Sequence, residues 1–403
     1  MTSAISFDDQ RPAIDGGQPV FPDGLPLARP AIADPASVAD AAVAILASGV
    51  LTNGPYVRRL EERAAEYLGV RHCVAVCSCT AGLMLVLRAS GLSGDVVLPS
   101  FTFSASAHAV VWNGLRPAFA DIRPDDLLLD PAAAARSTGV RTSAVLATHT
   151  YGTPCDTEAL GRLARDNGIR LFFDAAHAFG SRRGDRMVGG FGDAEVFSLS
   201  PTKVLIAGEG GIIATNDDSL AERCRVGRDY GNPGDYDTRF AGLNARMSEL
   251  HAAMALESLG QLDEHLVLRR QLVAMYRAGL AAVPGVRPQQ LGDGDESSYK
   301  DFTVTVDDAA FGVDRDTLVA VLRAEGIDTR CYFSPPVHRH QAYRDGPESV
   351  LPRTDWLADR VVSLPLWRDL PDGAIETVID VIARVHERAD EIRDRGRAAC
   401  VPS

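Results

Sequence analysis

Several features of secreted, membrane and nucleic-acid-binding proteins are missing from this chain of 403 residues. No apolar stretch reaches the length of a transmembrane helix, and the N-terminus lacks the basic start and apolar core of a secretion signal. There is no internal repeat and no low-complexity tract. Positive charge is scarce, because 41 Lys and Arg stand against 54 Asp and Glu and leave a net charge of −13. This balance argues against nucleic acid or an anionic membrane as partner, and we expect a cytoplasmic protein.

The cysteines form neither a disulfide framework nor a zinc motif. An odd number scattered through a long chain fits reduced thiols. Three of them lie within seven positions of one another, but no second pair with zinc spacing exists, so we expect a buried strand and the following turn, and no metal. The seven cysteines are Cys73, Cys77, Cys79, Cys155, Cys224, Cys331 and Cys400.

Short apolar runs alternate with helical stretches over the first half of the chain. The runs are too short for long helices and rich in Val, Ile, Phe or Ala, which favours strands, and helices between them imply parallel strands with crossovers. We therefore expect an α/β fold whose sheet is covered on both faces. The expected strands are 72–77, 95–99, 117–122, 143–148, 170–174 and 195–199, and the clearest helices are 80–90, 104–113 and 156–167.

One connection breaks this alternation. Residues 211–215 look like another strand, yet they follow the 195–199 run by only about ten residues, and a parallel crossover needs about a dozen or more. We therefore predict that this strand is antiparallel to its neighbours.

The remaining chain predicts a second, smaller unit. A helical pattern covers residues 244–282, followed by expected strands at 301–306 and 329–333 and helices at 315–325 and 372–393. Residues 1–25 are rich in Pro, Gly and Asp and look like a loose arm. We expect an arm (1–25), a large domain (26–255) and a small α+β domain with its linking helices (256–403).

Two residues in this framework suggest a cofactor. Asp174 ends a very apolar run, and Lys203 follows another, in apolar surroundings that lower the pKa of an amine. Pyridoxal phosphate needs both groups, an amine that forms a Schiff base with its aldehyde and a carboxylate that pairs with its ring nitrogen. A structural Asp174 and a solvated Lys203 are the alternatives. The glycines at 208–211 precede a strand, which is the wrong context for a dinucleotide fold.

Further residues around these two fit the same ligand. Ser78 and Thr80 lie where a strand turns into a helix, a place where free backbone N–H groups can bind a phosphate, although this signal taken alone favours a plain helix cap. Phe101 and Phe103 follow the second strand, where an aromatic ring can stack on a flat cofactor or simply fill the core. His177, three residues after Asp174, is close enough to touch the same ligand.

Taken together and in order, these segments resemble the DegT/DnrJ/EryC1/StrS family of sugar aminotransferases, over about residues 25–393. The matching motifs are SGVLTNGP at 48–55, SCTA at 78–81, PSFTF at 99–103, HTYG at 149–152, DAAH at 174–177, SLSPTK at 198–203, GEGG at 208–211, GLNARMSE at 242–249, and GIDTR at 326–330 before Pro336 and His338. The resemblance implies the fold of aspartate aminotransferase, fold type I. It has a large domain with a mostly parallel seven-stranded sheet flanked by helices, and a smaller α+β C-terminal domain.

The resemblance also implies a role for each matching residue. Lys203 would bind pyridoxal phosphate covalently, Asp174 would contact the ring nitrogen, Phe103 would stack on the ring, and His177 would lie near its hydroxyl. Cys79, Thr80 and Ser198 would hold the phosphate. Asn244 would reach the phosphate in the neighbouring subunit, because the family forms homodimers with shared active sites. Substrate contacts would come from Arg246, Tyr332 and His338.

Some positions depart from the family pattern. Cys79 replaces the usual glycine before the phosphate-binding threonine, His177 replaces a frequent glutamine, and Leu243 and Ala245 replace tyrosines. None of these changes removes a group that transamination needs. Relatives with histidine in place of the lysine catalyse dehydration, and Lys203 argues against that reaction here.

The resulting hypothesis is a pyridoxal-phosphate-dependent aminotransferase of amino-sugar biosynthesis. We expect a nucleotide-linked substrate, a dTDP-4-keto-6-deoxyhexose aminated at C4, with L-glutamate as donor, in the biosynthesis of an antibiotic, another secondary metabolite or a surface glycan. Amination of a 3-keto sugar or of an inosose is the alternative within this chemistry. A catalytically idle, cofactor-binding regulator and a nicotinamide-dependent dehydrogenase are the alternatives from other classes.

Overall fold

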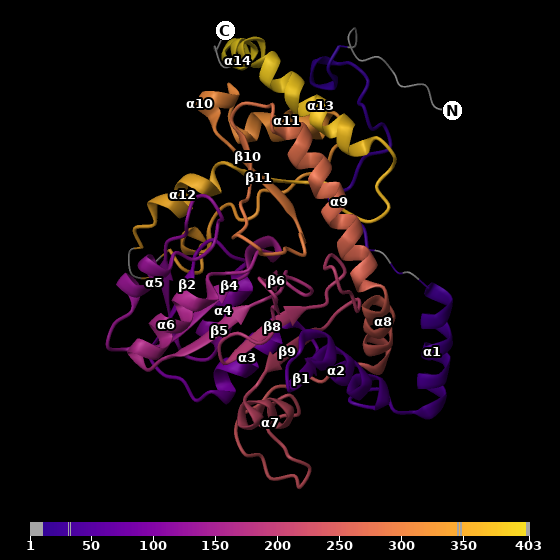
Figure 1. The fold of residues 1–403 in the computed structure, drawn as a ribbon, viewed down its shortest axis with the longest axis vertical. Helices are drawn as coiled ribbons and strands as arrows, with labels where there is room; N and C mark the ends of the chain where they lie inside the picture. Colours follow the sequence, from indigo (N-terminus) through magenta and orange to yellow (C-terminus); the bar gives the residue numbers. More distant parts are fainter. Residues whose placement is uncertain (1–10, 31, 33, 345, 347–348, 400–403) are drawn as a thin grey trace.

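The computed structural model describes residues 11–399 except residues 31, 33, 345, 347 and 348. A larger α/β unit occupies the lower part of Figure 1, and a smaller unit built from the C-terminal part of the chain lies above it. None of the helices in the described ranges is both long and apolar enough to cross a membrane.

A seven-stranded sheet forms the centre of the larger unit, in the order β1-β9-β8-β5-β4-β2-β3. β9 is antiparallel to both β1 and β8, whereas the other neighbouring strands are parallel, so the mostly parallel sheet and the reversed strand at 211–215 are both confirmed. The strands are β1 (His72–Val76), β2 (Asp95–Pro99), β3 (Arg116–Ala120), β4 (Thr142–Thr148), β5 (Arg170–Asp174), β8 (Ala194–Ser198) and β9 (Gly211–Thr215), and β6 (Arg182–Arg183) pairs with β7 (Arg186–Met187) in a separate small hairpin.

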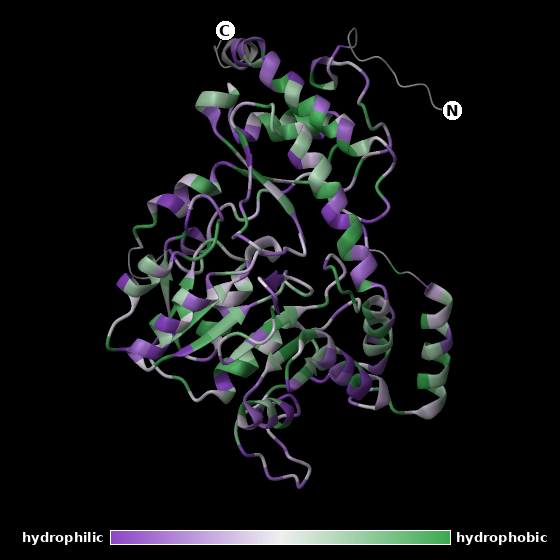
Figure 2. Ribbon diagram, in the orientation of Figure 1, coloured by the Kyte–Doolittle hydropathy of each residue, from purple (hydrophilic) through white to green (hydrophobic). Residues whose placement is uncertain are grey.

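Helices cover both faces of this sheet and form two separate cores. Neighbouring residues of one strand belong to different cores: Val97 of β2 packs in the first, and Val96 and Leu98 pack in the second. This explains why the strands are apolar at nearly every position, as the green central strands in Figure 2 show. The first core is closed by α2 (Pro55–Leu68), α5 (Pro131–Ser137), α6 (Thr157–Asn167) and α8 (Glu249–Gly260), and the second by α3 (Cys79–Ala89), α4 (Ser104–Trp112) and α7 (Asp218–Gly227).

The buried carboxylate of Glu249 joins two segments that are far apart in the sequence. It accepts hydrogen bonds from the backbone N–H groups of Gly54, Tyr56 and Val57 at 2.8, 2.8 and 2.9 Å, and so caps the N-terminus of α2. A Cβ at Gly54 would lie 2.7 Å from a carboxylate oxygen of Glu249, so only glycine fits there. The motifs at 48–55 and 242–249 are therefore two halves of one structural contact.

The smaller unit contains a three-stranded antiparallel sheet, β10 (Val286–Pro288), β11 (Phe302–Val306) and β12 (Val361–Leu364), in that order. Its long helix α9 (Leu262–Leu280) continues from α8, and α1 (Pro35–Ser48) lies against α8 on the right of Figure 1. The remaining helices are α10 (Asp308–Phe311), α11 (Arg315–Ala324), α12 (Pro352–Ala358), α13 (Ala374–Glu387) and α14 (Ala389–Ala399).

Three expectations for the smaller unit were wrong. Residues 329–333 are not a strand: only Arg330 pairs, with Ser363, while Phe333 packs against Phe101 in a cluster between the units. Instead, β12 pairs with β11, and the sequence pattern did not predict the strand β12. The last expected helix is two helices, α13 and α14, and the helical pattern at 244–282 begins only at Glu249.

Part of the expected N-terminal arm packs against the smaller unit. Residues 1–10 lie outside the described range. Leu25 is 2% exposed, belongs to the core of the smaller unit and pairs with Ile327, and the Phe21 N–H bonds the Glu325 carbonyl at 3.0 Å. The end of this segment is therefore anchored rather than loose.

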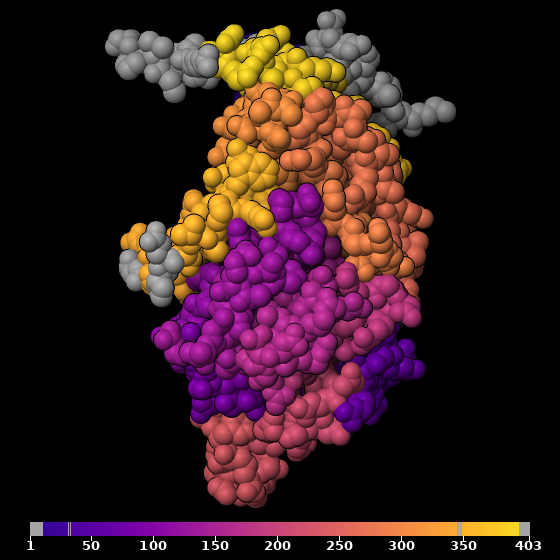
Figure 3. Space-filling view, turned by 60° about the vertical axis from the view of Figure 1, so that its left-hand side comes forward, coloured from indigo at the N-terminus to yellow at the C-terminus, as the bar shows by residue number. Residues whose placement is uncertain are grey.

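The larger unit, purple to magenta in Figure 3, lies directly against the smaller unit, orange to yellow. Asp121, which follows β3, links the two units: its carboxylate accepts hydrogen bonds from the N–H groups of Arg353 and Thr354 at 3.1 and 2.8 Å. The larger unit thus caps the N-terminus of α12 in the smaller one.

Candidate active site

The candidate residues gather where the parallel strands of the larger unit end. β5 ends at Asp174, which pairs with Val196 of the neighbouring strand β8, and Lys203 follows the end of that strand by five residues. The charges of Asp174 and Lys203 act on each other's pKa, so the two side chains lie near one another. The carboxyl edge of an open α/β sheet is where ligands bind in such folds.

Asp174 is held in place by two uncharged donors. Its side chain is 3% exposed; the Ser106 hydroxyl donates to Oδ2 at 2.6 Å and the Ala176 N–H donates to Oδ1 at 3.0 Å. Burial raises the pKa of this carboxyl, although both hydrogen bonds oppose the rise. Within the described residues it has no ion pair, so a cationic ring N–H is a suitable partner for it.

Lys203 offers an amine of unusual acidity. Its side chain is partly buried, and desolvation, reinforced by the positive charge of Lys300, lowers its pKa to about 8. At pH 7 about one amine in ten would then be uncharged, far more than for a lysine in water. Such an amine can act as a nucleophile and can both accept and release a proton near neutral pH.

The N-terminus of α3 faces the same edge of the sheet. Ser78 caps this helix by accepting a bond from the Ala81 N–H at 3.1 Å, and the thiol of Cys79 points to the Val196 carbonyl, 3.5 Å away. The backbone N–H groups of Cys79 and Thr80 and the Thr80 hydroxyl thus remain available for an anion. A Cβ at Gly211 would lie 2.7 Å from the Cys79 nitrogen, so glycine allows β9 to pack against this turn. Ser198 is buried at the end of β8.

His177 is fixed in one tautomer. Its Nδ1 accepts a hydrogen bond from the Tyr151 N–H at 3.1 Å, so the proton lies on Nε2. Burial and the charges of Lys203 and Lys300 hold its pKa well below the usual range. His177 is therefore a neutral donor, suited to an anionic oxygen such as the ring hydroxyl of the cofactor.

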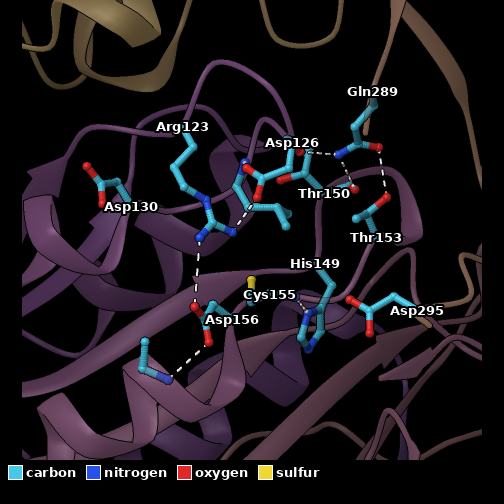
Figure 4. Close-up of polar contacts among 12 residues, drawn as sticks. Arg123, Asp126, Asp130, His149, Thr150, Thr153, Cys155, Asp156, Gln289 and Asp295 are labelled. Carbon is cyan, nitrogen blue, oxygen red and sulfur yellow. Dashed lines mark hydrogen bonds and ion pairs between the residues drawn. The ribbon is translucent and has the colours of Figure 1, made fainter. Parts of the chain in front are cut away.

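The turn at residues 149–153 is fixed from both units, through the contacts of His149 and of Gln289 (Figure 4). His149, fully buried, accepts a bond from the Cys155 N–H at 2.9 Å and donates to Glu195 at 3.1 Å. From the smaller unit, Gln289 accepts a bond from the Thr153 hydroxyl at 2.8 Å. The position of Tyr151, and through it that of His177, therefore depends on contacts across the junction.

The other predicted residues are placed differently. Phe103 lies at the start of α4 with a ring that is 61% exposed. Asn244 is exposed beside the end of β1, and Arg246 lies 3.4 Å from Asp229. Tyr332 lies near Lys300, with 5.4 Å between the ring centre and the amine. The positions of these four residues do not test the roles predicted for them, so those roles remain predictions.

Both ring nitrogens of His338 contact other side chains of the protein. Its Nδ1 lies 2.7 Å from the Ser100 hydroxyl and its Nε2 lies 3.2 Å from Asp355. The histidine thus joins the end of β2 to α12, and a substrate contact, as predicted, would compete with this link.

Sequence reasoning missed three residues of the site: Ser106, which holds Asp174, and the buried pair Lys300 and Asp301. The signal for Lys300 was the scarcity of lysine, since only two of the 41 lysines and arginines in the chain are lysines. Ser106 had no comparable signal, because a serine in the first turn of a helix is common.

The side chains fit pyridoxal phosphate. The site offers a buried carboxylate that makes no ion pair with the described residues, an amine of lowered pKa, N–H groups at a helix start and a neutral histidine donor. Lys203 would bind the aldehyde, Asp174 the ring nitrogen, and the start of α3 the phosphate.

Comparisons with known proteins agree with this fit. The model of the DegT/DnrJ/EryC1/StrS aminotransferase family matches residues 34–383. The spore coat polysaccharide biosynthesis protein SpsC of Bacillus subtilis (strain 168) is 33% identical over 363 residues, which are 86% of this chain and 93% of SpsC.

Solved structures are similar over nearly the whole chain. DesI, solved in the presence of its TDP-sugar product, has a TM-score of 0.91 and 42% identity, covering 95% of this chain and 98% of DesI. DesV of S. venezuelae has a TM-score of 0.84 and 34% identity, covering 90% of this chain and 99% of DesV.

Proposed function

The chain belongs to the DegT/DnrJ/EryC1/StrS aminotransferase family, a family of enzymes that use pyridoxal phosphate to aminate sugars, and on this premise we propose its substrate. The substrate is a nucleotide-linked keto sugar, a dTDP-4-keto-6-deoxyhexose, which receives an amino group at C4 from L-glutamate. The product is an amino sugar for a secondary metabolite such as an antibiotic, or for a surface glycan.

The observation that supports transamination most strongly is the placement of Lys203 and Asp174 at the same edge of the sheet. The choice of a nucleotide sugar is supported by the similarity to DesI, which was solved with a TDP-sugar product and is 42% identical. Amination at C4 and glutamate as donor are inferences from the motifs of the chain.

We further propose a cytoplasmic homodimer, in which Asn244 of one protomer reaches the phosphate site of its partner. The exposure of Asn244 in the single chain supports this arrangement, because an exposed residue is accessible to a second protomer. The domain limits expected from the sequence, 26–255 and 256–403, remain part of this proposal.

When bound, pyridoxal phosphate supplies an electron sink for the charge that develops at the reacting carbon. Asp174 would keep a proton on the ring nitrogen, and the N–H groups at the start of α3 would bind the phosphate. Lys203 Nζ would take the proton from the α carbon of glutamate in the first half-reaction and donate a proton to the reacting carbon of the sugar in the second. His177 would donate Nε2–H to the ring oxygen, and Phe103 would stack on the ring.

The test is an incubation of the protein with pyridoxal phosphate, L-glutamate and dTDP-4-keto-6-deoxyglucose, analysed by mass spectrometry. We expect the dTDP-4-amino sugar together with 2-oxoglutarate, and neither in a control without glutamate. Turnover only with a 3-keto isomer or an inosose would reject the C4 substrate, and no amine transfer to any keto sugar would reject the function.

A further inference from the structure

Lysine is almost absent from this chain, and both lysines belong to one site. Lys203 and Lys300 are the only two among 41 basic side chains, so arginine supplies the positive charge everywhere else. A second lysine beside Lys203 is therefore unlike the other cations of the chain.

Lys300 is buried with a single acidic partner. It is 6% exposed, and its amine lies 2.7 Å from Oδ1 of the adjacent Asp301, which is 5% exposed. The amine also lies 5.4 Å from the centre of the Tyr332 ring. Burial of such a pair is costly unless further contacts compensate it, so the pair is poorly explained by stability alone.

The backbone around the pair is clamped to the active site. The guanidinium of Arg269 donates to the carbonyls of Tyr299 and Lys300, at 2.6 and 2.9 Å. The Lys300 N–H donates to the Tyr151 carbonyl at 2.9 Å, and the N–H of the same Tyr151 donates to His177. One residue thus joins Lys300 to the turn that follows Asp174.

Asp301 keeps one oxygen free. Oδ1 is bound by Lys300, whereas Oδ2 is buried and has no hydrogen-bond partner among the described residues. A buried charged oxygen without a donor is rare in native proteins and calls for a ligand or a moving group.

The hydrogen bonds from Lys300 to Tyr151 and from Tyr151 to His177 bring this pair to the same site as Lys203, and the charges of the pair act on the Lys203 amine. After burial, the charge of Lys300 has the largest effect on the pKa of Lys203 and lowers it, and Asp301 raises it. Cys79 and Asp174 are the other ionisable groups that act on Lys203. His177 feels both lysines, which lower its pKa.

We propose that Lys300 and Asp301 are a positioning pair for Lys203: Lys300 favours its uncharged, proton-accepting amine, and the free Oδ2 of Asp301 stabilises its protonated form. Together the two residues let Lys203 accept and release a proton at the same pH, which a transamination with two half-reactions requires. This inference rests on the role of Lys203 in the proposed function and does not depend on which sugar is the substrate.

The proposal predicts opposite effects for the two residues. Lys300→Met removes a positive neighbour and leaves Asp301 unpaired, so the ammonium form of Lys203 gains stability and its pKa rises. Asp301→Asn removes a negative neighbour and leaves Lys300 unpaired, so the pKa falls. A close charge shifts a pKa by about 1–3 units, and we expect each midpoint to move by about one pH unit or more in its own direction.

The scarcity of lysine allows a direct measurement. Full-length chain labelled with lysine carrying ¹³C at Cε should give two lysine resonances, assigned with Lys203→Met and Lys300→Met, and a pH titration of the cofactor-free protein reports the Lys203 midpoint. In wild type we expect it near the value of about 8. The rate at which the same protein binds added pyridoxal phosphate, followed by visible absorbance, should show the same shifts.

Two controls separate this role from general damage. Asp295→Asn removes a buried carboxylate from another pair, Arg183 and Asp295 at 2.7 Å, and should leave the Lys203 midpoint unchanged. Lys300→Arg keeps the charge and should also keep the midpoint, which covers the case in which Lys300→Met does not fold. An unchanged midpoint in folded Lys300→Met or Asp301→Asn, shifts in the same direction, or a shift in Lys300→Arg as large as in Lys300→Met would overturn the proposal. No sugar enters the titration, so a wrong substrate would not affect its result.

Discussion

Lys203→Ala should lose turnover by about 10⁴-fold or more, because it removes both the covalent anchor of the cofactor and the group that moves the proton. The only other lysine is Lys300, whose amine is held by Asp301 at 2.7 Å. It cannot replace Lys203 without leaving a buried carboxylate unpaired.

The measurement has two parts, amine transfer from glutamate and the visible absorbance of protein loaded with pyridoxal phosphate. We expect both to disappear in Lys203→Ala, and the absorbance to persist in Lys300→Arg. Full turnover by Lys203→Ala would end the assignment of Lys203.

Asp174→Asn has the second-largest expected effect. An amide at this position cannot compensate a positive charge on the ring nitrogen, so that nitrogen loses its proton and the ring withdraws charge less well. Loss of one partner from a buried charge pair costs about 2–5 kcal/mol, which corresponds to a turnover lower by about 30- to 5000-fold.

Because asparagine has nearly the shape of aspartate, cofactor binding in this variant should fall less than turnover. Ser106→Ala is the matched control: it removes the 2.6 Å hydrogen bond to Asp174 but keeps the carboxylate, and should cost much less activity. Equal losses in the two variants would mean that the charge of Asp174 is not what matters.

Local signals made much of the larger unit predictable. Its strands are short, apolar and separated by helices, and the reversed direction of β9 followed from the length of the link before it. The smaller unit was harder, because β12 has only the four residues VVSL, whereas residues 329–333 end in Cys, Tyr and Phe as a strand could. Packing decides the outcome: Phe333 lies in the cluster with Phe101, and Pro335 and Pro336, just after the segment, lack the N–H groups with which a strand could continue.

The residues of the site also fall into a group that the sequence could predict and a group that it could not. Asp174 and Lys203 could be found in the sequence because each is a charged residue that breaks an apolar context at the end of a strand. The pair of Lys300 and Asp301, just before β11, could not, since it reaches the site only through the hydrogen bond of Lys300 to the turn at Tyr151. The same turn fixes the tautomer of His177, which no spacing in the sequence reveals.

The central claim is that Lys203 binds the cofactor, and reduction of the loaded enzyme with borohydride followed by peptide mass mapping tests it most directly. Only two lysines can bear the reduced cofactor, so the assignment is unambiguous. We expect the label on the peptide that contains Lys203 and none on the peptide that contains Lys300. A label on Lys300, or no labelled lysine in a protein that still transfers amino groups, would contradict the account.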